Sequence, residues 1–447
     1  MPSRCGSRIA SLTTAIICAL AIALVLRPSI HGNDGVQNYA YLRSLLFDGD
    51  LDFTNEYAHY MSRHAEWFDG KSIPRDPVTG LPINLYGVGN ALLWAPWVLA
   101  AHGFGWVANA AGAQFVLDGY SPLYAAAVGL ASAVYAAVGL VLLSDLLARM
   151  AGPRRSLLAV SIVWLASPLF FYMLLHPSMS HANSFFAATL LLVLYLGGDS
   201  LSRWAVMGAV AALMALVRFQ DGALLAALAV GEVARFCEQR GHDQAMRSWW
   251  VGRLRRYGLF GLTAVAVGSL QLLAWQVLQG SALSGPRAYM DQGSFGLMIP
   301  RYTLEVLFSP RHGLFYWHPG LMIGLVGLVA ARGAPRVRAM ALAAFFAQLW
   351  VVASWSHWWA GASFGHRMFV STLPFLAIGM ALILPTAPRG QFTAAVVAAL
   401  LVLWNFGLIV QYGSAMIPRQ TEVSLATMAY NNFVVLPRMA WERLTAP

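Results

Sequence analysis

Long apolar segments alternate with short polar ones along almost the whole of this 447-residue chain. A membrane-spanning helix needs roughly 20 mainly apolar residues, and about eleven segments reach or approach that length. Since 58% of the residues are hydrophobic and 11% are charged, the pattern predicts an all-α polytopic membrane protein. One transmembrane domain is expected over residues 1–412, with a short tail over 413–447. The expected spans are 9–26, 121–148, 156–176, 182–198, 203–217, 221–236, 257–277, 314–331, 339–355, 368–385 and 391–412.

Two segments depart from this simple pattern. Residues 89–108 are apolar but are interrupted by Pro96, His102 and three glycines, so we expect a pair of interfacial helices. Residues 203–236 are broken by the polar tetrapeptide Arg218–Asp221 and are too long for one span. We expect a short hairpin whose polar tip lies within the membrane.

The charge distribution orients these segments. A net charge of +10 could indicate a nucleic-acid partner, but the arginines concentrate in alternate loops. Cytoplasmic loops carry an excess of Lys and Arg, so we place the N-terminus in the cytoplasm and the long loop 27–120 outside. The basic charge then reflects topology, and no nucleic-acid partner is expected. The three cysteines are too scattered to predict a disulfide framework or a metal pair.

The outer loop 27–120 holds a concentration of acids near its start. A helix from Gly35 to about Phe47 is expected, with Asp34 as its N-cap and Gln37 at the capping-box position. A second helical stretch is expected from Asn55 to Phe68. The long loop is thus predicted to carry surface helices directly outside the membrane.

Two roles are open for the acids of this loop. Asp34 follows the first span closely and could act as a general base, or it could serve only as a helix cap. The series Asp48-x-Asp50-x-Asp52 could bind a divalent cation, although Phe53 replaces the glycine of a calcium loop. The other role of these three acids is to shape turns and cap the next helix.

Arginines at the predicted outer ends of spans suggest an anion site. Arg218, Arg311 and Arg367 could hold phosphate oxygens in bidentate fashion, or they could be ordinary interfacial arginines. Arg218 is the least ordinary because it lies at the sunken hairpin tip near Asp221. His181 belongs to no recognised metal-binding motif, and the requirement for a divalent cation is left open.

Four stretches show a resemblance to a known superfamily: Asp34–Arg43, Asp48–Tyr57, Leu314–Pro319 and Gly361–Arg367. The chain resembles the glycosyltransferase-C (GT-C) superfamily, in particular its protein-mannosyltransferase-like branch, which includes the bacterial lipid A aminoarabinose transferases. The resemblance implies a GT-C-like bundle and places Asp34 at the position of the catalytic base. Candidates for supporting roles are Arg43, Asp50, Asp52, Glu56, Asp221 and His181.

The resemblance also implies an activity. The donor would be a sugar linked to polyprenyl phosphate, and transfer to an acceptor hydroxyl would invert the anomeric centre. The acceptor could be a lipid, a glycan or a protein, and the site would face outward from the cytoplasmic membrane of a bacterium. The alternative is a transporter, flippase or polymerase-like carrier of lipid-linked saccharides. Such a carrier would more often show paired repeats or helices broken at mid-membrane, which the sequence lacks.

Overall fold

The computed structural model describes residues 4–68, 73–239, 243–285 and 299–445. These residues form a helical bundle without strands, apart from one isolated bridge between Arg75 and Pro82. The predicted all-α fold class is confirmed for these residues. The helices of the bundle are α1 (Arg4–Val25), α5 (Pro122–Ala151), α6 (Pro153–Leu165), α7 (Pro168–Leu174), α8 (His181–Leu196), α9 (Leu201–Val217), α10 (Leu225–Gln239), α11 (Asp243–Gln279), α15 (Gly320–Ala330), α16 (Pro335–Ala353), α17 (Leu373–Ile383) and α18 (Pro388–Gly413).

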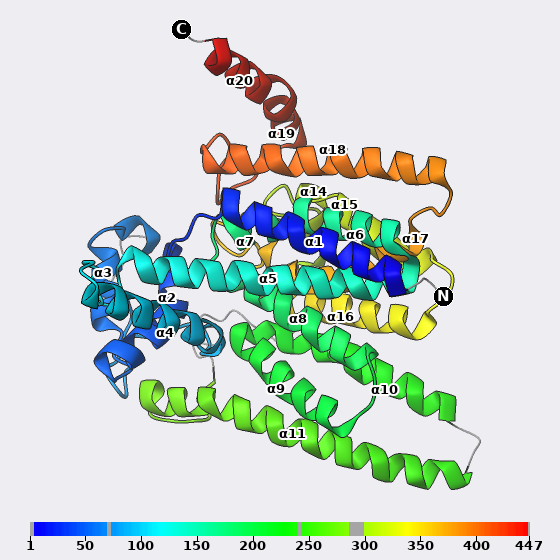
Figure 1. The fold of residues 1–447 in the computed structure, drawn as a ribbon, viewed down its shortest axis with the longest axis horizontal. Coiled ribbons are helices and arrows are strands. Elements are labelled where there is room, and N and C mark those ends of the chain that lie inside the picture. The colour runs from blue at the N-terminus through cyan, green and yellow to red at the C-terminus, as the bar shows by residue number, and fades with distance from the viewer. Residues whose placement is uncertain (1–3, 69–72, 240–242, 286–298, 446–447) are drawn as a thin grey trace.

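Most of these helices run along one common direction, so the bundle has two ends (Figure 1). The end that carries residues 27–120 is called the loop end here, and the N-terminus lies at the opposite end. By length and composition, six described helices can cross a membrane: α1, α4 (Gly89–Ala110), α5, α11, α16 and α18. Helices α6 and α7 would make a seventh span, bent by 68°. The chain is therefore an integral membrane protein, and several of the expected spans are shorter apolar helices packed inside the bundle.

Residues 89–108 differ from the expectation of two interfacial helices. They form one continuous helix, α4 (Gly89–Ala110), with Pro96 inside it. An internal proline removes one intrahelical hydrogen bond and its ring clashes with the preceding turn, but packing compensates, because Trp94 and Val98 are fully buried. Helix α4 lies beside the loop end of α5 (Figure 1).

The loop helices also begin and end differently from the prediction. Helix α2 (Gly32–Arg43) starts three residues early, continues as a π-helical turn η1 (Ser44–Asp48), and stops at the left-handed Gly49. The predicted helix 55–68 is split into α3 (Thr54–Met61) and a 3-10 turn η2 (Ala65–Phe68). The split occurs because the Tyr60 carbonyl accepts from both Arg63 N and His64 N, which closes a tight turn.

Short elements connect the bundle at the loop end. The expected break at Arg218–Asp221 is present, and it takes the form of a 3-10 turn between α9 and α10. A second 3-10 turn precedes α17. The short connecting elements are η3 (Phe219–Leu224), α13 (Thr303–Phe308), α14 (Leu314–Trp317) and η4 (Arg367–Thr372). After α18 come α19 (Leu425–Tyr430), η5 (Asn431–Val435) and α20 (Leu436–Thr445), which ends the described chain and projects from the bundle (Figure 1).

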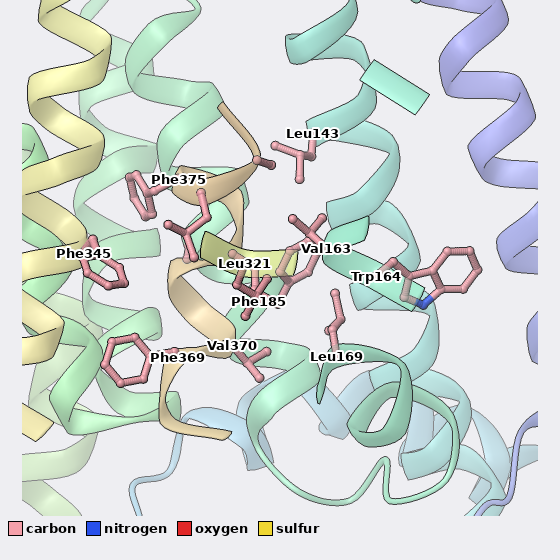
Figure 2. Packing of buried hydrophobic residues seen from close by; sticks show 14 of the residues in the cluster. Leu143, Val163, Trp164, Leu169, Phe185, Leu321, Phe345, Phe369, Val370 and Phe375 are labelled. Carbon is pink, nitrogen blue, oxygen red and sulfur yellow. The ribbon is translucent and has the colours of Figure 1, made fainter. Parts of the chain in front are cut away.

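Two apolar clusters hold the molecule together. The larger lies in the centre of the bundle, where Phe185, Leu321, Phe345 and Phe375 meet from four helices (Figure 2). Helices α15 and α17 approach so closely that a Cβ on Gly327 would lie 2.0 Å from the Gly379 carbonyl oxygen. Small residues permit such contacts between membrane helices.

The second cluster attaches the loop to the bundle. It joins Tyr39 of α2, Phe53 and Tyr57 around α3, Trp94 of α4 and Tyr124 of α5, all fully or almost fully buried. Burial of aromatic side chains is a large stabilising contribution. Helix α2 is therefore fixed against the bundle, and so is the acid in its first turn.

Candidate functional site

Asp34 lies in the first turn of α2, where it is not the helix cap. The N-cap is His31, which makes no side-chain capping bond, and Gln37 Nε2 donates to Asn33 Oδ1 at 2.7 Å. The predicted capping box is therefore wrong, because the helix begins before Asp34. The Asp34 carboxylate is instead free to form a tertiary contact: its Oδ2 accepts a hydrogen bond from Arg367 Nη1 at 2.7 Å.

Arg367 opens η4 after a left-handed turn. Gly365 has φ +58°, and a Cβ there would lie 2.1 Å from His318 Nε2, so both backbone and space require glycine. His366 and His318 are buried beside it. This turn carries the Arg367 guanidinium, with 11% of its side chain exposed, into contact with Asp34, of which 20% is exposed.

Arg218 lies at the break between α9 and η3, with an extended backbone. Its Nη1 donates to Ser180 Oγ at 2.8 Å and lies 3.2 Å from His181 Nδ1. Its Nη2 contacts Met368, the residue after Arg367. His181 also contacts the backbone of Arg367. Two of the three arginines expected from the sequence are thus brought together around His181.

Asp221 is fully buried and holds this region in place. Its Oδ2 accepts from Ser184 Oγ at 2.5 Å, and its Oδ1 accepts from Ser371 Oγ at 2.8 Å. The carboxylate therefore connects η3 to α8 and η4. It positions the segments that carry Arg218 and Arg367, and it makes no ion pair with either among the described contacts.

Arg311, the third arginine, is adjacent to His312 in the chain. Its guanidinium carbon is 3.9 Å from the centre of the Trp359 ring. His312 Nδ1 donates to the Trp359 carbonyl at 2.9 Å. Burial lowers the pKa of His312 to about 4, and the positive charges of Arg311 and Arg367 act in the same direction. The charges of Arg311 and Arg367 thus both reach the His312 imidazole.

The remaining candidates form a separate cluster at the other end of α2. Arg43 comes nine positions after Asp34, which is about 14 Å along a helix. Arg43 pairs with Asp48 and, at 3.0 Å, with Glu56. This cluster ties α2, η1 and α3 together, and we assign it to the architecture of the loop.

The acids that could have held a cation make turn contacts. Asp50 Oδ1 accepts from Ser44 Oγ at 2.7 Å, and Asp52 Oδ1 accepts from Thr54 N at 3.0 Å at the start of α3. Across the described part of the chain, no three His, Cys, Asp or Glu side chains are grouped as a metal site requires.

Glu56 is the titrating member of this cluster. It is fully buried, and its burial raises the pKa of the carboxyl to about 7, although the hydrogen bond and charge of Arg43 oppose the shift. A buried carboxyl is easier to keep neutral than charged. The loop therefore contains an acid that titrates near neutral pH.

Three buried asparagines connect the helices behind Asp34, and the sequence pattern did not reveal them. Asn38 Nδ2 donates to the Asp34 carbonyl at 2.8 Å. Asn90 Nδ2 donates to Asn38 Oδ1, and Asn183 Nδ2 donates to Asn90 Oδ1, both at 2.8 Å. This asparagine ladder joins α2, α4 and α8. For Asn90 and Asn183, the signal in the sequence is an amide inside a mainly apolar helix.

Arg419 is a further residue that the sequence did not single out. It lies in the segment after α18, with its guanidinium carbon 5.0 Å from the centre of the Tyr412 ring. Its charge reaches His31 and His176 and contributes, after burial, to lowering the pKa of both. Arg419 therefore places an exposed positive charge from the segment after α18 at the loop end.

A small cavity adjoins Arg218. Its volume is about 20 Å³, and it is lined by residues 85–87 and 217–220. This is room for about one water-sized group. A phosphate oxygen matches that size, and a whole sugar does not.

Comparison with known proteins shows a likeness at the level of the fold. No family model and no curated protein sequence matches the chain. Among solved structures, the fold is similar to the crystal structure of ArnT from Cupriavidus metallidurans bound to undecaprenyl phosphate. The TM-score is 0.54 at 14% identity, over 99% of this chain and 72% of the other. At that identity the likeness establishes the fold alone.

Proposed function

We propose that this protein is a membrane glycosyltransferase that moves a sugar from a polyprenyl-phosphate donor to an acceptor hydroxyl. The observation that carries the proposal is the 2.7 Å contact between Asp34 and Arg367, next to the buried Arg218. Arg218 is linked to the segment that carries Arg367 through Met368 and His181, so a carboxylate and two arginines occupy one end of a GT-C-like bundle. A base and an anion clamp are the two groups that this transfer requires.

In the proposed reaction, Asp34 takes the proton of the acceptor hydroxyl as that oxygen bonds to the anomeric carbon. The bond from the anomeric carbon to the phosphate oxygen breaks on the opposite face, so the configuration inverts. The electron pair leaves with the polyprenyl phosphate. A positioned carboxylate typically contributes about 10²- to 10⁴-fold to such a step.

Arg218 and Arg367 would stabilise the leaving phosphate. A guanidinium stays charged when buried and can hold two phosphate oxygens at once. Arg218 is 9% exposed, so its charge acts in a poorly solvated setting, where preorganised donors are most effective. Arg311 is a more distant member of the same cationic surface. His181 and Asp221 position the two clamp residues.

The donor class is supported by the fold. The ArnT structure with this fold contains undecaprenyl phosphate, and a lipid donor matches a site at the ends of apolar helices. We assign the acceptor only as a hydroxyl of a lipid, glycan or protein. The proposed location is the cytoplasmic membrane of a bacterium, with the loop end facing outward.

A transfer assay with purified protein in nanodiscs tests the proposal. A panel of polyprenyl-phosphate sugars is offered with lipid, glycan and peptide acceptors, and product is followed by mass spectrometry. We expect wild-type transfer and a loss of about 10²- to 10⁴-fold in Asp34→Asn. Asp50→Asn, another acid of the same loop, is the matched control and should keep the wild-type rate.

The ion pair needs a second control, because Asp34→Asn also breaks the contact with Arg367. Arg367→Gln breaks the same contact but keeps the carboxylate. We expect it to weaken donor binding, while Asp34→Asn lowers the turnover of bound donor. Near-wild-type turnover in Asp34→Asn would show that Asp34 is not the general base. Movement of the donor across the bilayer without sugar transfer would favour the alternative function, a carrier of lipid-linked saccharides.

A further inference from the structure

A second cavity lies at the end of the bundle opposite the candidate active site. Its volume is about 580 Å³, and it lies where the ends of α5, α8 and α17 meet the beginnings of α6 and α16. Figure 1 places these helix ends together at the end of the bundle that carries the N-terminus. Pockets of about 300–1,000 Å³ accommodate whole small molecules, so this cavity has room for a ligand.

The charged side chains that line this cavity are all basic. Arg155, Arg332 and Arg336 contribute to the wall, and no Asp or Glu is among the described residues that line it. Arg155 Nε donates to the Ala151 carbonyl at 2.6 Å, which holds its side chain in place. Three arginines without a lining acid attract an anion.

Arg336 adds an unsatisfied donor. Its Nη1 pairs with Glu238 at 3.3 Å, while its Nε is buried and has no hydrogen-bond partner among the described residues. Arg336 also lies in the first turn of α16, where backbone N–H groups lack intrahelical partners and the helix dipole is positive. The first turn of α16 therefore adds positive potential at the wall of the cavity.

The rest of the wall is aliphatic. Leu146, Leu196 and Leu382 come from the ends of three different helices, and Met150 and Val337 extend the apolar surface. An inorganic phosphate has no apolar part that could pack against this surface. A molecule with an anionic head and a hydrocarbon chain matches both parts of the wall.

We propose that this cavity binds the phosphate headgroup of an anionic membrane lipid, with the start of an acyl chain against the leucines. Basic pockets between membrane helices are suited to such headgroups. The inference is independent of the proposed transferase activity, because it concerns the opposite end of the bundle. The site would couple the stability of the α15–α16 connection to the lipid composition of the membrane.

The test measures retention of phosphatidylglycerol against phosphatidylcholine by native mass spectrometry of the detergent-solubilised full chain. We expect wild-type protein to prefer phosphatidylglycerol. The double variant Arg155→Gln/Arg332→Gln should weaken that binding by about 30-fold, since each arginine near an anionic lipid surface contributes about fivefold. The matched control is Arg149→Gln/Arg154→Gln, which removes two charges from the same end outside the cavity and should keep the preference.

Two further variants test the apolar part of the cavity and the ion pair between Arg336 and Glu238. Leu382→Phe reduces the apolar part of the cavity and should weaken lipid binding while leaving the arginines intact. Glu238→Gln removes the partner of Arg336 and should not weaken it. Melting temperature and size-exclusion profile show that each variant is folded.

Three outcomes would overturn the inference. One is equal retention of phosphatidylglycerol by wild type and Arg155→Gln/Arg332→Gln. Another is an equal loss in the Arg149→Gln/Arg154→Gln control, which would indicate diffuse surface charge. The third is displacement of the lipid by inorganic phosphate with no preference for phosphatidylglycerol, which would indicate a free-phosphate site.

Discussion

Asp34 and Arg367 are 333 positions apart in the chain, yet their side chains are 2.7 Å apart. The contact places a carboxylate and a guanidinium together at the surface of the bundle, and it fixes the direction in which each points. Charge-assisted hydrogen bonds of this kind are about twice as strong as neutral ones. A base held in this way loses little rotational freedom when an acceptor hydroxyl reaches it.

Replacement of Arg218 by lysine tests the anion clamp. An ammonium cannot reproduce the two-pronged geometry of a guanidinium, and hydrogen bonds to charged groups contribute about 1.5–3 kcal/mol. We expect Arg218→Lys to weaken binding of polyprenyl phosphate by at least about tenfold, measured by thermophoresis. Arg311→Lys is the control, and its effect should be below about threefold, because its guanidinium is stacked on Trp359 beyond His312. A larger effect of Arg311→Lys than of Arg218→Lys would indicate that Arg311 is the residue that holds the phosphate.

Glu56 gives the loop a predicted dependence on pH. Its pKa in the folded protein, about 7, lies above the model-peptide value of about 4.3, so the folded state binds the proton more tightly. Stability from this group is therefore complete below about pH 4.3 and is lost as the pH rises toward 7 and beyond. Melting temperatures measured from pH 5 to 8 should fall more steeply for wild type than for Glu56→Gln, which is permanently neutral. Parallel curves would show that Glu56 does not titrate in this range.

At the scale of elements, the position of α2 decides where Asp34 lies. The apolar cluster around Tyr39 and Trp94 holds one face of this helix, and the asparagine ladder holds the other side to α4 and α8. The ladder is fully buried, so each amide depends on its neighbours. A helix set in this way can present a reactive group with little motion.

Replacement of Asn90 by leucine breaks the centre of the ladder. It removes the partners of the buried Asn38 Oδ1 and Asn183 Nδ2, and each unsatisfied atom costs about 1–3 kcal/mol. We expect a lower melting temperature and, because α2 is displaced, a slower transfer reaction. Asn109→Leu is the matched control on the same helix, since Asn109 bonds only to the exposed turn at Phe115. Equal melting temperatures of Asn90→Leu and Asn109→Leu would show that the asparagine ladder does not stabilise the fold.

The sequence predicted elements far better than contacts. The apolar pattern located the bundle helices, and the polar break at Arg218 was expected because the run around it is too long for one span. The start of α2 was missed because His31 makes no side-chain capping bond that a pattern could reveal. The partner of Asp34 was also missed, since nothing in a local pattern relates the first turn of α2 to η4. Asn90 shows the same limit: its type marks a polar contact, and only the packing of three helices identifies its partners.

At the scale of the whole molecule, the two ends have different chemistry. The loop end carries the acids, the aromatic cluster and the buried Arg218, while the opposite end carries the cavity lined by Arg155, Arg332 and Arg336. The sequence-based orientation places the second end in the cytoplasm, because cytoplasmic loops are enriched in arginine. A candidate active site and a candidate lipid site would then face opposite sides of the membrane.

Cysteine labelling in intact cells tests this orientation. Val78 is 69% exposed in the loop between α3 and α4, so Val78→Cys in a cysteine-free background is a reporter for the loop end. Cys237, near the end of α10, is naturally exposed and reports the opposite end when it is the only cysteine kept. We expect a membrane-impermeant maleimide to label Val78→Cys in intact cells and to label Cys237 only after the membrane is made permeable. Because an odd number of crossings separates the two positions in the predicted topology, both results must change together if the orientation is inverted. Labelling of Cys237 alone in intact cells would place Asp34 and Arg218 in the cytoplasm, where an outward-facing transfer reaction is impossible.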